Sequence, residues 1–515
     1  MNRYPLGIQT FEEIRRNNQY YVDKTDLIYN IVKGSKNNFL SRPRRFGKSL
    51  LVTTMQAYFE GKKDLFKGLA IEKLEKEWVK YPVIHIDLSS GKYYEVQRIM
   101  STLDFLLSRY ELKYDITPRD LSGFGDRFNN IIQTAAAQTG QKVVVLIDEY
   151  DAPMLDSNAK PELQEQIRSI MRDFFSPLKA NEGLLRFVFL TGITKFSQLS
   201  IFSELNNIKN YSLDDEYGAI CGFTQEEILS TFHEGIHEMA KANGLTTEQT
   251  VAKMKEQYDG YRFTPHCPNI YNPYSVLNAL HDKKFSNYWF ATGTPTFLLE
   301  LLIKNDIEMP QLEGIVATED QFDSPTDNIG NPIPVLYQSG YLTIKDYDEG
   351  IYTLGYPNEE VRMGLNRSML NYIAPQYGLK TTAFAAQFRA AMRKDDIDTA
   401  MKVLQSFLAA FPYDIYHNRE DYFQAILFTI FITLGFTIHA EVKTARGRID
   451  LLISTKTTIF VMELKIDQSA EKAMEQIDAK DYTLPYKHDG RRVFKVGINF
   501  STEKRTVDEW RYEEA

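Results

Sequence analysis

Apolar and polar positions follow two alternating periods in the first part of the chain. Mainly apolar runs at 82–88, 142–147 and 186–190 are separated by stretches whose apolar residues recur every three or four positions. Such runs predict strands buried on both faces, and the other spacing predicts amphipathic helices. Strands that alternate with helices indicate a parallel sheet covered on both sides. We therefore predict a doubly wound α/β domain over residues 1–210.

The pattern then becomes helical. Thr224 and Glu227 have the spacing of a capping box, which predicts a helix that starts after Thr224. Residues 311–333 are rich in Asp, Pro, Gly and Asn, and predict an exposed linker or a long loop. The segment 336–357 predicts a helix end followed by a hairpin, which weakly resembles a winged-helix element. We expect residues 211–375 to form a helical lid or linker.

The last part of the chain predicts a second α/β domain, over residues 376–515. It opens with helices, the longest of them over 419–434. Strands with one intervening helix follow, in the order strand 437–442, strand 449–454, strand 458–465, helix 469–481 and strand 493–498.

Composition and charge exclude several classes of protein. A length of 515 residues with 43% hydrophobic and 25% charged residues fits roughly two to four globular domains. The net charge of −9 gives no general basic field, so any contact with DNA must use a local patch. Two cysteines are too few for a disulfide framework or a Cys-rich zinc site. The chain has no apolar run long enough for a membrane span and no signal-peptide pattern, which favours the cytoplasm.

A candidate phosphate-binding loop lies between a predicted strand and a predicted helix. It reads Arg-Pro-Arg-Arg-Phe-Gly-Lys-Ser from Arg42 to Ser49, so arginine stands where the usual G-x-x-x-x-G-K-[ST] pattern has its first glycine. Lys48 would reach the β- and γ-phosphates, and the Ser49 hydroxyl would ligate Mg²⁺. Backbone N–H groups and the helix N-terminus would supply the remaining donors. The residues expected to bind ATP here are Arg44, Arg45, Phe46, Gly47, Lys48, Ser49 and Leu50.

Two acids support this interpretation of the loop. Asp148 and Glu149 follow a buried strand, where a P-loop ATPase needs one acid to hold Mg²⁺ and another to orient the attacking water. Thr191 or Thr194, after the next strand, is placed to contact the γ-phosphate. Alternatively, Gly-Lys-Ser is a chance tripeptide, the acids are a solvated strand end and the threonines are turn residues. The order of strand, loop, helix and distal acidic strand favours the nucleotide site.

A second group of polar residues lies on the predicted C-terminal strands. Asp450 lies on the first strand of a predicted hairpin, and Glu463 and Lys465 lie on the second. Glu463 and Lys465 are two positions apart, so their side chains point to the same face of the sheet. The two carboxylates suit Mg²⁺ or Mn²⁺, which would activate a water, and Lys465 would orient that water or offset phosphate charge. Glu420 is a candidate for orienting the metal ligands or for binding a second metal ion, and Gln476, on the following helix, is a candidate for positioning the site or the backbone phosphate.

The alternative for this group is a surface ion pair. A Glu-x-Lys on a strand is usually a solvated cross-strand pair. The aspartate at hairpin spacing and the flanking helices with Glu420 and Gln476 favour a metal site instead. Basic residues in the same region are candidates for contact with DNA phosphates: Arg446, Arg448, Arg491, Arg492 and Lys495.

Together these motifs resemble a bacterial family with an AAA-ATPase-like N-terminal domain and a PD-(D/E)xK nuclease-superfamily C-terminal domain. The resemblance implies a P-loop NTPase sheet, a helical middle region and a restriction-endonuclease-like α/β domain. The arginine-rich loop is specific to this family, so the missing glycine is a family trait. Ile449 replaces a proline of the nuclease pattern, a change that the superfamily tolerates. The matching stretches are 21–25, 39–49, 146–151, 191–195, 447–450, 463–465 and 476–482.

We therefore expect an ATP-binding, ATP-hydrolysing regulatory module joined to a Mg²⁺-dependent DNA nuclease-like domain. One alternative is a switch that holds ATP and binds nucleic acid or protein without cutting it. Another is a motor acting on nucleic acid, although the chain shows no assignable arginine finger or helicase motif. The sequence leaves oligomerisation open.

Overall fold

The computed structural model divides the chain into two compact units. Unit 1 comprises Met1–Thr292 and Gly314–Glu360, and unit 2 comprises Gly293–Glu313 and Val361–Ala515. The residues that the structure describes are 3–89, 91–117, 123–157, 160–195, 208–290, 296–305, 307, 309–324, 331–373, 378–408, 427–432 and 436–515.

A five-stranded parallel sheet forms the centre of unit 1, with the strand order β2-β3-β4-β1-β5. The strands are β1 (Asn37–Ser41), β2 (Val83–Asp87), β3 (Val143–Asp148), β4 (Leu185–Gly192) and β5 (Lys209–Asn210). The helices before and between them are α1 (Phe11–Arg16), α2 (Thr25–Lys33), α3 (Lys48–Phe59), α4 (Ala70–Leu74), α5 (Val96–Lys113), α6 (Phe124–Thr139), α7 (Ala152–Ser157), α8 (Pro161–Phe175) and α9 (Pro177–Ala180).

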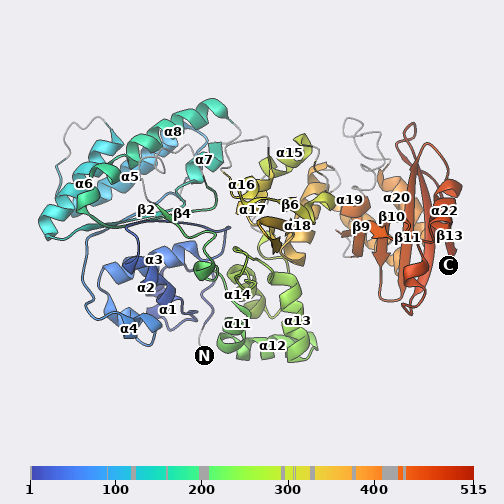
Figure 1. Cartoon of the computed structure of the whole chain (residues 1–515), viewed down its shortest axis with the longest axis horizontal. Helices are drawn as coiled ribbons and strands as arrows, with labels where there is room; N and C mark the ends of the chain where they lie inside the picture. The colour runs from blue at the N-terminus through green and yellow to red at the C-terminus, as the bar shows by residue number, and fades with distance from the viewer. Residues whose placement is uncertain are drawn as a thin grey trace. The chain divides into compact units, whose positions relative to one another are not determined.

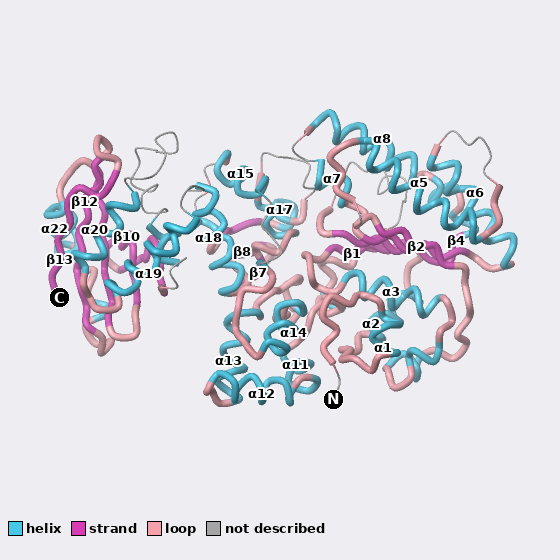
Figure 2. Tube along the Cα trace, turned by 180° about the vertical axis from the view of Figure 1, so that it is seen from behind, coloured by secondary structure: helices cyan, strands magenta, loops and turns pink. Residues whose placement is uncertain are grey.

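Helices cover both faces of this sheet, as the sequence predicts. Helices α5, α6 and α8 lie on one face and α1, α2 and α3 on the other (Figure 1), and Figure 2 shows the same layers from behind. Every residue of β3 is buried, which explains its continuous apolar run. Local signals set the helix limits: α8 has a proline in its first turn, and α6 ends at Gly140 in the left-handed conformation.

The rest of unit 1 contains helices and a small antiparallel sheet of order β6-β8-β7. Thr224 forms the predicted capping box with Glu227 at the start of α11. The predicted helix end and hairpin are present as α17, β7 and β8. The elements are α11 (Gln225–Thr231), α12 (His233–Asn243), α13 (Thr247–Tyr258), α14 (Pro273–Asp282), β6 (Ile315–Ala317), α16 (Glu319–Phe322), α17 (Ile333–Gln338), β7 (Thr343–Asp348) and β8 (Ile351–Gly355).

The prediction of an exposed linker or long loop over residues 311–333 is wrong for its described part. Strand β6 and helix α16 lie there, and Ala317 and Phe322 are buried. Among the described residues that suggested a loop, Gly314 directly precedes β6 and Asp323 is the C-cap of α16. Residues 325–330 lie outside the described residues.

Unit 2 contains a five-stranded sheet with the order β13-β12-β11-β10-β9. Strands β11 and β12 are parallel, the other pairs are antiparallel, and α22 packs against β11 and β12. The elements are α15 (Thr296–Lys304), α18 (Glu359–Ile373), α19 (Gly378–Met392), α20 (Ile397–Leu408), β9 (Thr437–Thr444), β10 (Gly447–Ser454), β11 (Thr458–Ile466), α22 (Ala470–Ala479), β12 (Arg492–Ser501) and β13 (Thr506–Glu514).

Two predictions for unit 2 need comment. Strand β13 is missing from the predicted order, because its charged residues outnumber its apolar ones and only its first two residues are buried. The predicted helix over 419–434 lies mostly outside the described residues, and its described part, 427–432, is helical.

The predicted division into three domains stays a prediction. Residues 1–210 share unit 1 with most of 211–375, and the chain passes into unit 2 after Glu360. None of the described helices is both long and apolar enough to cross a membrane.

Glu360 is a buried carboxylate at the start of α18. Its oxygens accept hydrogen bonds from the Ser275 hydroxyl at 2.6 Å and from the Trp289 backbone N–H at 2.7 Å. Burial nevertheless raises its pKa from 4.5 to about 7. Between these values the folded chain keeps a proton that the unfolded chain has lost, so stability falls as the pH rises from 4.5 to about 7.

Replacement of Glu360 by Gln should remove this pH dependence. The amide can accept from the Trp289 N–H and donate to the Ser275 hydroxyl, so the local bonds survive. We expect E360Q to exceed wild-type stability at about pH 8, by at most about 3 kcal/mol, and to match it at about pH 4.5. Urea denaturation at both pH values checks this. An equal difference between the two proteins at both pH values would contradict it.

Candidate functional site

The candidate phosphate loop lies at the carboxyl edge of the first sheet. Ser41 ends β1 beside Gly192 at the end of β4, and α3 begins at Lys48. Gly47 precedes that helix with φ of +94°, a conformation that favours glycine. Apart from Gly47 itself and its two chain neighbours, no heavy atom of the described residues lies within 4 Å of where a Cβ at Gly47 would stand. The start of α3 therefore has an open approach for a phosphate group.

Lys48 is buried in this loop, with a relative exposure of 3%. Its ammonium Nζ donates to the carbonyl oxygens of Arg42 at 3.0 Å and Pro43 at 3.3 Å. The same atom forms an ion pair with the Glu149 carboxylate at 3.2 Å. The structure therefore brings together the lysine and the candidate water-orienting acid that the sequence predicts.

The candidate magnesium ligands also lie together. The Ser49 hydroxyl lies close enough to the Asp148 carboxylate to lower the pKa of that group. Burial, and next the neighbouring charge of Glu149, raise the pKa of Asp148 to about 7. A hydroxyl and a carboxylate are oxygen donors of the kind that Mg²⁺ prefers. Glu149 itself has φ of +51°, a strained backbone of a kind found at functional sites.

The two candidate threonines after β4 use their hydroxyl groups inside the protein. Thr191 Oγ1 donates to the Leu40 carbonyl at 2.8 Å. Thr194 Oγ1 donates to Asp151 at 2.8 Å, and the Thr194 and Ile193 N–H groups donate to the same carboxylate oxygen at 2.6 and 2.9 Å. Asp151 thus fixes the end of β4 against the end of β3. The prediction that Thr191 or Thr194 contacts a γ-phosphate stays a prediction.

The outer side of the loop is covered by the rest of unit 1. The Phe46 ring is buried against Tyr261 and Phe263, so only its backbone N–H is available to a phosphate. The exposed Arg45 lies over the Tyr274 ring at 5.0 Å. The Arg44 side chain is exposed, and its carbonyl accepts from Trp289 Nε1 at 3.2 Å. Leu50 lies in the first turn of α3, where its carbonyl accepts from the Thr54 hydroxyl at 2.7 Å.

Sequence reasoning missed a connection between the segment after β4 and the ends of helices α16 and α17. The Lys195 N–H donates to Gln338 at 2.8 Å, and Lys195 Nζ pairs with Asp323 at 3.0 Å. Asp323 is 7% exposed, and burial raises its pKa. Asp323 lies in a segment whose composition resembles a loop, so the sequence did not predict its contact with Lys195. The only available signal was Lys195, which directly follows the candidate threonines.

The second candidate site lies on β10 and β11. Leu451 pairs with Met462, which puts Asp450 directly across from Glu463. Asp450 accepts a hydrogen bond from the Leu464 N–H at 2.8 Å, and Lys465 Nζ contacts Glu463 at 3.2 Å. Two carboxylates and one ammonium thus meet on one face of the sheet, as the two-residue period predicts.

The donor set of this site fits a hard divalent cation, because both candidate ligands are carboxylates. Within the described part of the chain, no three His, Cys, Asp or Glu side chains gather as a metal site. Glu420, the third acid expected at this site, lies outside the described residues. Gln476 is half-buried on α22, the helix that packs against β11 and β12.

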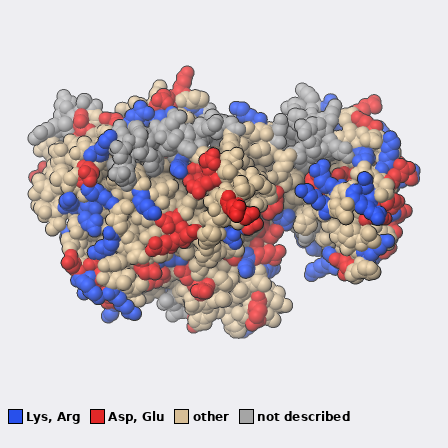
Figure 3. Space-filling view, in the orientation of Figure 1, with Lys and Arg blue, Asp and Glu red and all other residues tan. Residues whose placement is uncertain are grey.

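The predicted basic patch is neutralised by acids. Each of its five members contacts a carboxylate, and on the face that Figure 3 shows, basic and acidic side chains of this unit lie among one another. Such pairing leaves less positive potential for DNA phosphates than the sequence suggests. The pairs are Arg446 with Asp481, Arg448 with Glu441, Arg491 with Asp489, Arg492 with Asp395 and Glu514, and Lys495 with Asp478 and Glu513.

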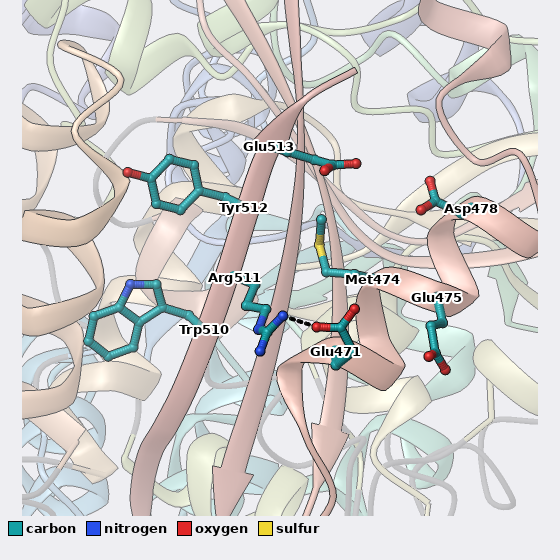
Figure 4. Close-up of a pocket in the computed structure, with 8 residues that line it drawn as sticks. All are labelled: Glu471, Met474, Glu475, Asp478, Trp510, Arg511, Tyr512 and Glu513. Atoms are coloured by element: carbon teal, nitrogen blue, oxygen red, sulfur yellow. Dashed lines mark hydrogen bonds and ion pairs between the residues drawn. The ribbon is translucent and has the colours of Figure 1, made fainter.

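A separate hollow of about 370 Å³ lies between α22 and β13. Figure 4 shows Arg511 reaching from β13 to Glu471 on α22, with the other acids around them. Its lining does not include Asp450, Glu463 or Lys465, so it is distinct from the candidate metal site. The lining residues are Glu471, Met474, Glu475, Asp478, Trp510, Arg511, Tyr512 and Glu513.

The first sheet, with its loop and acidic strand end, has the arrangement of a P-loop domain of the AAA type, and the family matches agree. A family model described as "Predicted AAA-ATPase" matches residues 5–202. A model described as "PD-(D/E)XK nuclease superfamily" matches residues 418–510, which include Asp450, Glu463 and Lys465. The predicted family resemblance and fold class are confirmed.

A full-length relative is the "Uncharacterized protein in vnfD 5'region" of Azotobacter chroococcum mcd 1. It is 32% identical over 519 residues, which cover 98% of each chain. This chain belongs to the same family as that protein, and it combines a predicted AAA-ATPase domain with a PD-(D/E)XK nuclease superfamily domain.

Solved structures with partial similarity come from archaeal proteins. The Aeropyrum pernix ORC2 protein (ADPNP–ADP complexes) is 11% identical with a TM-score of 0.26, covering 70% of this chain and 94% of its own. The Aeropyrum pernix ORC1 protein in complex with DNA is 10% identical with a TM-score of 0.24, covering 69% and 92%. CDC6P from Pyrobaculum aerophilum is 11% identical with a TM-score of 0.24, covering 69% and 96%. The fold described above rests on this chain's own strands and helices.

Removal of the Asp151 carboxylate should destabilise unit 1. Replacement by Ala leaves the N–H groups of Ile193 and Thr194 buried without an acceptor, which we expect to lower the free energy of unfolding by roughly 1–3 kcal/mol. Urea denaturation measures this. The matched control is D214A, because Asp214 accepts from the Glu216 N–H in a more exposed place. Equal losses in the two variants would contradict the role of Asp151.

Proposed function

We propose that this protein is an ATP-binding and ATP-hydrolysing regulatory ATPase fused to a Mg²⁺-dependent DNA nuclease. The observation that carries the proposal is the meeting of Lys48 with Glu149, and of Ser49 with Asp148, at one sheet edge. The second support is the meeting of Asp450, Glu463 and Lys465 on one face of the other sheet. Nucleotide state would control the rest of unit 1 and, through it, DNA cleavage.

At the first site, the chain's residues bind the nucleotide and orient the water. Lys48 would exchange its contact with Glu149 for the β- and γ-phosphates, which frees the Glu149 carboxylate to orient the attacking water. Ser49 and Asp148 would hold Mg²⁺, which when bound offsets the charge on the phosphates. The N–H groups from Arg44 through Leu50 would donate to phosphate oxygens.

At the second site, Asp450 and Glu463 would hold Mg²⁺ or Mn²⁺. The bound cation lowers the pKa of a water and stabilises charge on the scissile phosphate. Lys465 contacts the Glu463 carboxylate, and it would orient the attacking water or offset charge on the phosphate. Gln476 would position the site or contact the DNA backbone from α22.

Replacement of Lys48 by Ala should abolish ATP binding. The variant loses the buried ammonium that contacts the phosphates, which we expect to cost roughly 2–5 kcal/mol of binding free energy. Isothermal titration calorimetry with ATP and Mg²⁺ measures this. The control K36A removes a more exposed lysine that pairs with Glu182 before β1. ATP binding by K48A at wild-type affinity would show that the loop is not the site.

Replacement of Asp450 by Ala should remove DNA cleavage. The variant loses one of two candidate metal ligands, so cleavage of single-stranded and duplex DNA with Mg²⁺ or Mn²⁺ should fall to background. Gel analysis of labelled DNA measures this, with D508A as a control that removes an aspartate paired with Lys504 on the surface of the same unit. Cleavage that survives in D450A would point to another site or to a contaminant.

A second candidate function is a switch that holds ATP and binds nucleic acid or protein without cutting. The observation that favours it is the pairing of every member of the basic patch with a carboxylate. Single-turnover ATP hydrolysis, measured with and without DNA, separates the two functions. ATP hydrolysis that DNA accelerates supports the nuclease proposal. Slow ATP hydrolysis at a rate that DNA does not change supports the switch.

A further inference from the structure

Arg42, which occupies the position of the first P-loop glycine, is almost fully buried, with a relative exposure of 2%. Its Nη1 donates to the carbonyl oxygens of Ser41 and Ser212, each at 2.9 Å, and its Nη2 donates to the carbonyl of Tyr217 at 3.0 Å. The guanidinium also lies over the Phe263 ring at 4.5 Å. Most of these partners come from the segment after β4, so Arg42 joins the base of the loop to that segment.

Phe46, at the other end of the loop, contacts the same segment. Its ring lies 5.2 Å from the Phe263 ring in an edge-on arrangement, and its carbonyl accepts from the Gly222 N–H at 3.1 Å. Phe263 therefore contacts both Arg42 and Phe46. We call Arg42, Phe46 and Phe263 the loop clasp.

The clasp is connected to the phosphate-binding lysine through the main chain. The carbonyl of Arg42 accepts a hydrogen bond from Lys48 Nζ at 3.0 Å. The residue whose side chain is fixed by Ser212 and Tyr217 therefore also holds the Lys48 ammonium. A buried guanidinium that loses its hydrogen-bond acceptors raises the free energy of the folded protein. The loop therefore keeps its position only while it packs against this segment.

We infer that Arg42 and Phe263 are positioning residues for nucleotide binding, and that they replace the first glycine as the element that sets the path of the loop. Nucleotide binding and the packing of residues 212–263 against the loop are then thermodynamically linked, so each favours the other. This inference rests on the proposed nucleotide site and assigns its control to that segment. Neither residue touches the phosphates, and both act through the position of Lys48.

Two conservative variants test the clasp. R42K keeps the positive charge but loses the planar set of donors that serves the three carbonyls. F263L keeps an apolar side chain but loses the face under the guanidinium. The control F128L removes a buried aromatic ring that stacks on Phe174 in the core of the same unit, away from the loop. Calorimetric titration with ADP and Mg²⁺ gives the Kd, and thermal denaturation gives the Tm of each protein.

We expect the Kd for ADP to rise by roughly 5–150-fold in R42K and F263L. F128L should lower the Tm while its Kd stays at the wild-type value, which separates positioning from general stability. Wild-type Kd values in folded R42K and F263L would overturn the inference and leave the proposed function standing. A wild-type protein that binds no ADP would overturn both.

A measurement on the wild-type protein covers the case in which the variants do not fold. Hydrogen–deuterium exchange of a peptide spanning 217–223 reports on the Gly222 N–H that donates to Phe46. ADP should slow exchange in this peptide and leave the amides of α12 unchanged. Unchanged exchange at 217–223 with ADP bound would overturn the inference.

Discussion

The buried ammonium of Lys48 is the interaction on which the first site depends. A charge that is only 3% exposed must be held by oxygen atoms, and here these are the carbonyls of Arg42 and Pro43 and the Glu149 carboxylate. Those partners come from two strands that are not neighbours in the sheet. The order β2-β3-β4-β1-β5 makes the meeting possible, because all strands are parallel and end at one edge.

The same constraint extends into the rest of unit 1. The loop keeps Lys48 in place only while Arg42 and Phe46 are seated on the segment that follows β4. Lys195 makes a second connection, from the end of β4 to Asp323 and Gln338. A nucleotide that moves Lys48 away from Glu149 would act on the first of these connections, because Lys48 donates to the Arg42 carbonyl. This gives a physical route by which phosphate binding reaches the helices and small sheet of unit 1.

The sequence predicts the parts of the molecule that follow a simple period. Strand β3 is continuous in apolar residues because both faces are buried, and Asp450 meets Glu463 because side chains alternate along a hairpin. Strand β13 lacks an apolar period, so it is missed. Contacts between residues far apart in the sequence are also missed. The carbonyls of Ser212 and Tyr217 accept hydrogen bonds from Arg42, and no local sequence pattern predicts these bonds. Some ion pairs of the basic patch, such as Arg492 with Asp395, also join residues far apart in the sequence.

We propose that nucleotide bound in unit 1 controls DNA cleavage by the nuclease superfamily domain. The most direct measurement is the rate of DNA cleavage by the wild-type protein with Mg²⁺, without nucleotide, with ATP and with a non-hydrolysable ATP analogue. The account predicts a cleavage rate that changes with nucleotide and differs between ATP and the analogue. Cleavage at one rate under all three conditions would contradict it.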